Sequence, residues 1–197
     1  RTVADEVEGK QVTSIPFEME VAKKVRITNL KGKKLWWQLY ELQIIGPGMG
    51  DIDQYKPSDR HYLQLSNAEA IKIGWSSAKQ DRSVTGGDLK VAGEKFSHGI
   101  GTHAHSEIIY DLAGRDYKRF YSKVGHNDGG QNTYLTFEVH LDDKKVFDSG
   151  EMTKGDPAKV LDLPLKEANE LKLVVTNGKD GRPEGDHADW GNACLIQ

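Results

Sequence analysis

Three histidines lie close together in the segment "HGIGTHAHS", residues 98–106: His98, His103 and His105. Imidazole can ligate a metal ion, transfer a proton or exchange hydrogen bonds with a hydroxyl group. In an extended chain His103 and His105 would share one face, a spacing that could place two imidazoles on one zinc ion. These residue types alone leave metal binding, catalysis and ligand recognition open.

A second polar cluster is the segment "DHAD", residues 186–189. Asp186 or His187 could supply the third zinc ligand of a metal-assisted hydrolase that also uses His103 and His105. The chain, however, contains no HExxH, cysteine-pair or GxSxG motif, and a flexible polar loop offers no apolar pocket in which a carboxylic acid would stay protonated. We therefore expect no catalysis by this domain, and the hydrolase is the alternative hypothesis.

The composition limits the class of partner. The 197 residues include 27 basic and 30 acidic side chains, which give a net charge of -3 and no support for nucleic acid as a partner. The single cysteine, Cys194, excludes an internal disulfide framework. Apolar runs are far shorter than the roughly 20 residues that span a bilayer. We expect no membrane insertion, and an export signal would lie outside this sequence.

The elements that must position these residues are predicted to be strands. Hydrophobic segments are short, rich in β-branched and aromatic residues, and bounded by Gly, Asn, Asp or Pro. This pattern predicts an all-β protein, a sandwich of two antiparallel sheets. The expected strands are Lys24–Asn29, Trp37–Ile45, Ala70–Trp75, Ser106–Leu112, Arg119–Val124, Tyr134–Leu141, Lys144–Ser149, Lys159–Leu163, Glu170–Thr176 and Asn192–Ile196.

A domain boundary is expected at "GPGMGDIDQYKPSDR", residues 46–60, where prolines, glycines and polar residues interrupt the strand pattern. Residues 1–45 are too few to close a sandwich alone, so this strand-rich fragment is the tail of an adjacent β module or packs against the next one. Residues 61–197 form the main domain. The pair Trp36 and Trp37 favours one core side chain and one interface contact, and suggests a structural inter-module sandwich as a further alternative.

Five motifs occur in order after residue 60: "HYLQLSNAEAIKIGWSSAKQDRSV", "HGIGTHAHSEIIYDLAG", "FDSGEMTKGDPAK", "LKLVVTNGKDG" and "DHADWGNA". With them, residues 61–197 resemble the NPCBM domain, carbohydrate-binding module family 51. The resemblance implies a galactose-binding-like β-sandwich of the jelly-roll type. It also implies a non-catalytic appendage of a secreted or cell-surface bacterial glycoside hydrolase, which binds galactose, N-acetylgalactosamine or blood-group-like glycans.

Two segments depart from the family pattern. This chain has "HNDGGQN" after "KVG", where the family usually shows an acidic turn, and "THAHS" carries a second histidine where proline is common. If these loops contact sugar, ligand preference will differ from the family norm. The N-terminal "AKKVRITNLKGKKLWWQLYELQIIGPG" resembles the last strands of a discoidin-type galactose-binding domain.

Sugar recognition needs an apolar plate and directional polar groups. An aromatic ring packs against the C–H face of galactose, and Trp75 and Trp190 are the candidates, with core packing as the alternative for each. His103 is the histidine expected to contact the ligand or to make a buried structural hydrogen bond. The other polar candidates are Gln80, Arg82, Asn127, Asp128, Asp186, His187 and Asp189, with solvated turns as the alternative. Acidic loops such as "GGD" and "GDHAD" suggest a structural calcium ion without assignable ligands.

Overall fold

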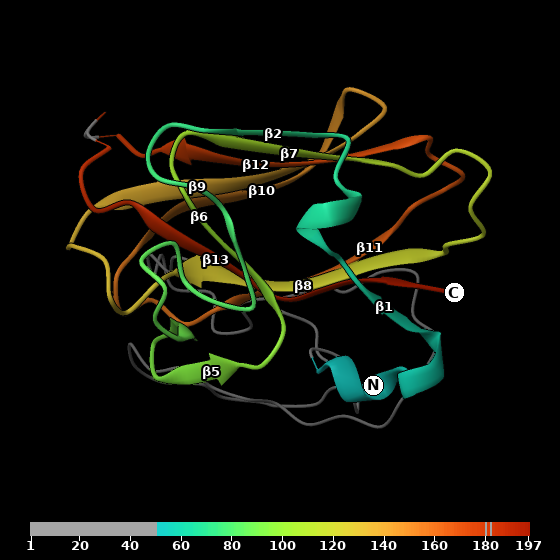
Figure 1. Cartoon of the computed structure of the whole chain (residues 1–197), viewed down its shortest axis with the longest axis horizontal. Coiled ribbons are helices and arrows are strands. Elements are labelled where there is room, and N and C mark those ends of the chain that lie inside the picture. Colours follow the sequence, from blue (N-terminus) through green and yellow to red (C-terminus); the bar gives the residue numbers. More distant parts are fainter. Residues whose placement is uncertain (1–50, 180, 182) are drawn as a thin grey trace, which may run out of the picture. The chain divides into compact units, whose positions relative to one another are not determined.

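The computed structural model describes residues 51–179, 181 and 183–197, and it confirms an all-β fold of two antiparallel sheets packed face to face (Figure 1). Three short 3-10 helices are η1 (Ile52–Gln54), η2 (Pro57–Asp59) and η3 (Leu65–Asn67). The strands are β1 (Arg60–Tyr62), β2 (Ala70–Ile73), β3 (Lys79–Gln80), β4 (Leu89–Val91), β5 (Glu94–Phe96), β6 (Gly99–His103), β7 (Ser106–Asp111), β8 (Arg119–His126), β9 (Tyr134–Leu141), β10 (Lys144–Thr153), β11 (Lys159–Pro164), β12 (Glu170–Asn177) and β13 (His187–Ile196).

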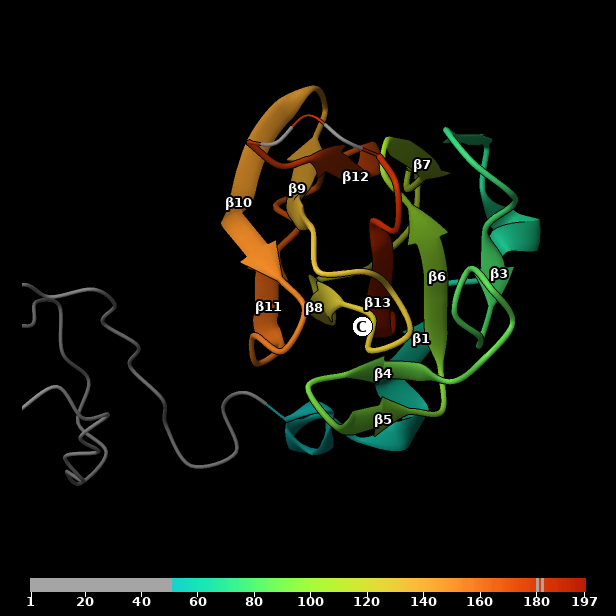
Figure 2. The ribbon, with the colours of Figure 1, turned by 90° about the vertical axis from the view of Figure 1, so that its left-hand side faces the viewer.

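The first sheet has the order β11-β8-β13-β6-β3, with β1 paired to β13, and the second has the order β10-β9-β12-β7-β2. The chain passes between the sheets after β1, β2, β6, β7, β8, β10, β11 and β12, and the loops that follow β2, β6, β8 and β12 lie at the same end of the sandwich. Figure 2 looks onto this end and shows the two layers, with the small β4–β5 hairpin beneath the first sheet.

Strand β9, which was expected from the sequence, alternates between buried and partly exposed side chains. Leu135, Phe137 and Val139 are buried, whereas the residues between them are partly exposed. The "DDKK" turn then reverses the chain into β10, and both Asp142 and Asp143 have positive φ, at 48° and 64°, as a tight two-residue hairpin turn requires. This hairpin is the part of the sandwich that local sequence specifies most directly.

Strand β6 is not among the strands expected from the sequence. Gly99 and Gly101 lie inside β6, where other backbone comes close to both residues. A Cβ on Gly99 would lie 2.2 Å from the carbonyl oxygen of Trp190, and a Cβ on Gly101 would lie 2.2 Å from that of Arg82. Glycine here permits close approach, not reversal of the chain.

Strand β13 begins at His187, earlier than the predicted start at Asn192, because the polar stretch "DHADW" is buried. Trp190 was predicted to be a loop residue that could stack on sugar. It instead has no exposed surface and contacts Phe137 edge-on, with the ring centroids 5.0 Å apart. The alternative considered for Trp190, core packing, is correct, and Trp190 presents no face to a ligand.

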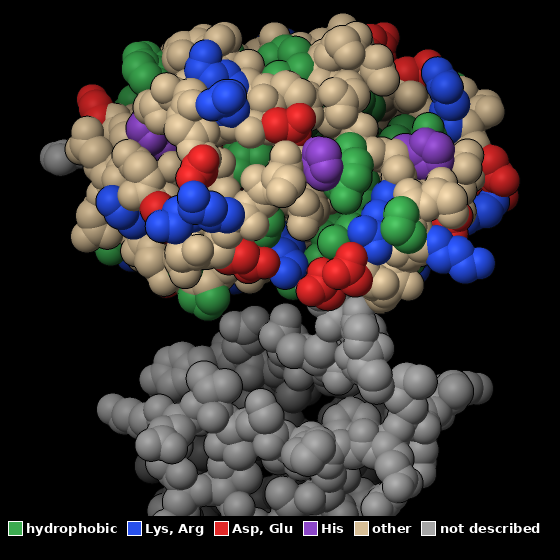
Figure 3. Space-filling model, turned by 60° about the horizontal axis from the view of Figure 1, so that its bottom comes forward, with side chains coloured by type: hydrophobic (Ala, Val, Ile, Leu, Met, Phe, Trp, Pro, Cys, Tyr) green, Lys and Arg blue, Asp and Glu red, His purple; other side chains and the backbone are tan. Residues whose placement is uncertain are grey.

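Residues 51–60, expected to be linker, pack on the outer side of the first sheet. Ile52 is buried against a cluster that includes Tyr121, Cys194 and Ile196. Figure 3 views this side of the molecule. Chain contacts separate residues 48–197 from residues 1–47. The fragment 1–45 with its predicted strands and tryptophans lies outside the described residues.

None of the described residues belongs to a helix long and apolar enough to cross a membrane.

Candidate functional site

Three aromatic side chains gather where the loop after β2, the end of β6 and the start of β13 meet: Trp75, His103 and His187. The ring centroids of Trp75 and His103 lie 5.2 Å apart, and those of the two histidines 5.7 Å apart. Trp75 and His187 are nearly parallel, at 6° and 6.0 Å. These three side chains are called the ring cluster below.

Strand pairing places the two histidines together. His103 is the last residue of β6 and His187 the first of β13, and the two are direct partners in the antiparallel register. Side chains of directly opposed residues point to the same face of a sheet, here the outer face of the first sheet. Because β6 was not predicted, this pairing was missed by sequence reasoning.

The loop after β2 brings Trp75 to the histidines. The Gly74 N–H donates to the carbonyl of His105 at 2.8 Å, which ties the loop to the short β6–β7 connection. In turn, the Ala104 N–H donates to the carbonyl of Asp186 at 3.1 Å, which ties that connection to the start of β13. Three segments distant in sequence are therefore joined by backbone hydrogen bonds around the ring cluster.

The imidazoles of the ring cluster have defined hydrogen-bonding roles. His103 Nδ1 lies 2.5 Å from the carbonyl oxygen of Ala104, and because a carbonyl only accepts, Nδ1 carries the hydrogen. Within the described residues His103 Nε2 makes no hydrogen bond. Burial, and then the neighbouring His103, lower the pKa of His187, which favours its neutral form at pH 7. The Nδ1 of His187 is buried, so Nε2 is the nitrogen that a ligand can reach.

Trp75 supplies an apolar surface beside these nitrogens. It is 52% exposed, whereas the two histidines are buried or partly buried. One face of its indole is parallel to His187. An exposed aromatic plate next to neutral imidazoles can take a ligand that combines a C–H face with hydroxyl groups.

The zinc hypothesis lacks its ligand set. His105 lies beyond the β6–β7 turn, with Nε2 3.3 Å from Glu107 Oε1. Across residues 51–179, 181 and 183–197, no three His, Cys, Asp or Glu side chains are grouped so that they could hold a metal ion. In one of the acidic loops that suggested calcium, the Asp88 carboxylate pairs with Lys95 at 2.5 Å. The calcium ion stays a prediction without an assigned site.

The family model of the NPCBM/NEW2 domain matches residues 59–196. The chain belongs to this family. An NPCBM-type solved structure, the CBM51 of Clostridium perfringens GH95 in complex with methyl-galactose, is 39% identical and covers 66% of this chain and 94% of that one, with a TM-score of 0.62. The CBM51-2 of Clostridium perfringens ZmpB, solved with its INT domain in complex with GlcNAc, is 31% identical over 66% of this chain and 30% of that chain, with a TM-score of 0.62.

A curated relative of this chain is alpha-1,3-galactosidase B of Akkermansia muciniphila, which is 24% identical over 90% of this chain. The chain spans only 23% of the length of that relative. The NPCBM domain described here is thus a carbohydrate-binding module of the kind found as non-catalytic parts of larger enzymes. The fold and the non-catalytic character expected from the sequence are confirmed.

Two predicted sugar contacts of the NPCBM domain, Asn127 and Asp189, instead bond to each other. Asn127 Nδ2 donates to Asp189 Oδ2 at 2.5 Å, and the N–H of Lys90 in β4 donates to the same oxygen at 2.8 Å. Asp189 has no exposed surface, and burial raises the pKa of its carboxyl to about 7. The pair fastens the β4–β5 hairpin to the first sheet and does not face a ligand.

Asp128 and Asp186 also lie away from the open surface of the ring cluster. Asp128 Oδ2 accepts from the Gly93 N–H at 3.0 Å and pairs with Lys90 at 3.3 Å, so it also holds the hairpin. Asp186 precedes His187 and is completely buried. Its side chain cannot reach a ligand, although its carbonyl helps to build the ring cluster.

Gln80 and Arg82 belong to a different part of the surface. The Gln80 side chain is occupied by backbone, accepting from the Leu65 N–H at 2.9 Å and donating to the carbonyls of Leu63 and Gly99, each at 3.2 Å. Arg82 is exposed and donates to the carbonyl of Gly86 at 3.2 Å. Of the predicted site residues that the structure describes, Trp75, His103 and His187 share the open surface of the ring cluster.

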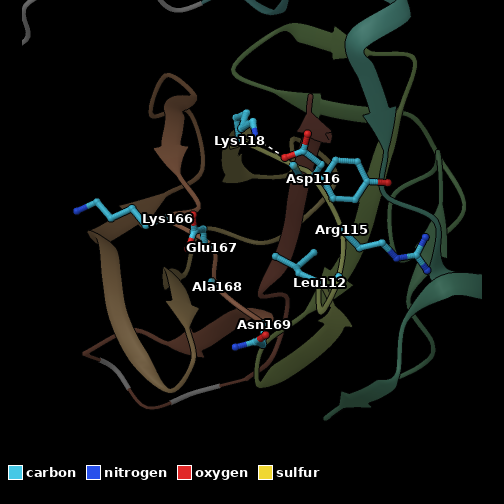
Figure 4. Close-up of a pocket in the computed structure, with 10 residues that line it drawn as sticks. Leu112, Arg115, Asp116, Lys118, Lys166, Glu167, Ala168 and Asn169 are labelled. Carbon is cyan, nitrogen blue, oxygen red and sulfur yellow. Dashed lines mark hydrogen bonds and ion pairs between the residues drawn. The ribbon is translucent and has the colours of Figure 1, made fainter.

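A separate pocket of about 380 Å³ lies at the opposite end of the sandwich, between the β7–β8 and β11–β12 loops (Figure 4). Lys118 and Asp116 form an ion pair on its wall, while Arg115 and Lys166 extend away from each other. None of the predicted site residues lines this pocket, and it contributes nothing to the ring cluster.

Proposed function

We propose that this domain binds galactose-type termini of glycans through the ring cluster of Trp75, His103 and His187. The observation that carries the proposal is the half-exposed indole of Trp75 beside two imidazoles whose Nε2 atoms can exchange hydrogen bonds with hydroxyl groups. An aromatic ring packs on the C–H face of a sugar, and the imidazole nitrogens orient its hydroxyls. The similar module solved with methyl-galactose supports this ligand class.

The same comparisons support a biological role. A curated relative is named for galactosidase activity and is much longer than this chain. We infer that the domain is attached to a glycoside hydrolase that acts outside a bacterial cell, where the module holds the enzyme near its glycan. A single shallow site gives weak affinity, and a tethered catalytic domain gains from even weak binding because its effective concentration at the substrate rises.

Isothermal titration with a panel of sugars tests the ligand class. The panel contains methyl-galactoside, N-acetylgalactosamine, blood-group oligosaccharides and N-acetylglucosamine, the last because a similar module was solved with it. We expect binding to the galactose-type sugars and weaker binding to N-acetylglucosamine. A His187→Ala variant should lose affinity, whereas His140→Ala, on the outer side of the other sheet, should not. Failure of every galactose-type sugar to bind, or unchanged affinity in His187→Ala, would reject the proposal.

A further inference from the structure

We propose that a second sugar-binding site lies on the outer side of the first sheet, near the start of β6. A cleft of about 310 Å³ is lined there by Asp81, Arg82, Gly87, Asp88, Leu89, Lys95, Phe96 and Ser97, and it is called the side cleft below. The proposal rests on the proposed function in that the ligand is a sugar. His98 lies beside the side cleft and His103 belongs to the ring cluster. The two residues are five positions apart, a distance of roughly 16 Å in an extended strand, so the two sites are separate.

The imidazole of His98 lies next to the side cleft and packs on Tyr62. The rings of Tyr62 and His98 lie 4.2 Å apart at 31°, and the His98 side chain is 47% exposed. His98 follows Ser97 of the lining, and its Nδ1 lies 3.9 Å from Asp81 Oδ1. Phe96 and Leu89 also line the cleft, but both are largely buried, so the exposed imidazole of His98 is the ring that a sugar could contact. A sugar ring placed here would meet an apolar surface next to a carboxylate.

Asp81 is held in one orientation and keeps an acceptor free. Its Oδ1 accepts from the Gly99 N–H at 2.9 Å and from Gln80 Nε2 at 3.1 Å. Its side chain is 39% exposed, and in the described part of the chain Oδ2 accepts no hydrogen bond. The Asp81 backbone is left-handed, with φ 56°, and the Asp81 N–H donates to the Gly99 carbonyl at 2.8 Å. Gln80 is therefore a positioning residue for Asp81.

Arg82 supplies donors next to this acceptor. One guanidinium nitrogen donates to the Gly86 carbonyl, and no carboxylate within the described residues forms an ion pair with Arg82. A carboxylate and a guanidinium in neighbouring residues match two adjacent hydroxyls, one donating and one accepting. Positive and negative groups are mixed over this side of the molecule (Figure 3), and the cleft itself has two acidic and two basic side chains. This balance favours a neutral hexopyranose over an anionic ligand.

Nuclear magnetic resonance titration of the whole chain with methyl-galactoside and N-acetylglucosamine distinguishes the two sites. In a Trp75→Ala variant, which disables the ring cluster, we expect the amides of Asp81, Arg82 and Gly99 to shift still, with millimolar affinity. In Asp81→Asn, where the amide oxygen can keep the bond from Gly99, these shifts should weaken about tenfold or more. The shift of the Trp75 indole should persist in that variant.

Arg82→Ala is the second variant, because Arg82 is exposed and outside the core, and it should weaken the same shifts without unfolding the chain. His140→Ala, on the outer side of the other sheet, is the control and should change neither set. The proposal is overturned if the amides around Asp81 do not shift with either sugar. It is also overturned if they shift in Asp81→Asn and in Arg82→Ala as strongly as in the unmodified chain. The proposed function fails separately, if the Trp75 indole does not respond in the unmodified chain.

Discussion

Removing the indole of Trp75 should weaken binding of methyl-galactoside about tenfold. Trp75 is 52% exposed, so about 130 Å² of a side chain of about 250 Å² is open to solvent. His187 lies parallel to one face, and a sugar on the other face would cover about half of the open area, roughly 65 Å². At about 25 cal/mol per Å², this burial contributes about 1.6 kcal/mol, which corresponds to slightly more than tenfold in Kd.

Isothermal titration of Trp75→Ala and Trp75→Phe checks this magnitude. The phenylalanine variant keeps an aromatic ring and should lose less affinity than the alanine variant. Ile71→Ala is the matched control, because Ile71 is also an exposed apolar side chain, 42% exposed, and lies on neighbouring β2 without belonging to the ring cluster. Melting temperatures should be similar in all three variants, since neither side chain is part of the buried core.

The reasoning is refuted if Trp75→Ala binds methyl-galactoside within twofold of the unmodified chain while its melting temperature is unchanged. It is also refuted if Ile71→Ala loses as much affinity as Trp75→Ala. In the first case the indole does not contact the sugar, and in the second the loss reflects a general change at this edge of the sandwich.

Three further predictions concern stability. The carboxyl pKa of Asp189 is about 7 in the folded chain and about 3.9 in the unfolded chain, so between these pH values only the unfolded chain releases the proton and rising pH should destabilise the fold. The melting temperature of Asp189→Asn should not fall with pH in this window. The same fall in both proteins would contradict the prediction. Gly101→Ala should cost more than about 2 kcal/mol in urea unfolding because its Cβ would meet the Arg82 carbonyl at 2.2 Å, whereas Gly86→Ala, which meets no atom within 4 Å, should cost about 1 kcal/mol for its positive φ. Ile52→Ala should lower the free energy of unfolding by about 2 to 4 kcal/mol, and no loss would show that residues 51–59 do not stabilise the sandwich.

Local sequence predicted most of the long strands, β9 and β10 among them, because alternating burial leaves a period-two pattern and the turn residues Asp142 and Asp143 follow β9 directly. It did not predict β6, because glycines are typical of turns in sequence, and only the structure shows that close backbone requires them here. The polar residues before Trp190 likewise indicated a loop, although they belong to the buried strand β13. Its carboxylate at Asp189 is tolerated in a buried strand because hydrogen-bond donors from β4 and Asn127 reach it.

The sequence by itself determined the fold class, the family and the type of residue available for recognition, since these depend on local pattern and motif order. Only the tertiary structure decided which candidates share a surface. Trp75, His103 and His187 come from three separate segments, and strand register together with backbone bonds at Gly74 and Ala104 places their rings side by side. Trp190 and Asp189 are buried and therefore cannot contact a ligand, because a side chain without exposed surface cannot present a face to a sugar, whatever its chemistry.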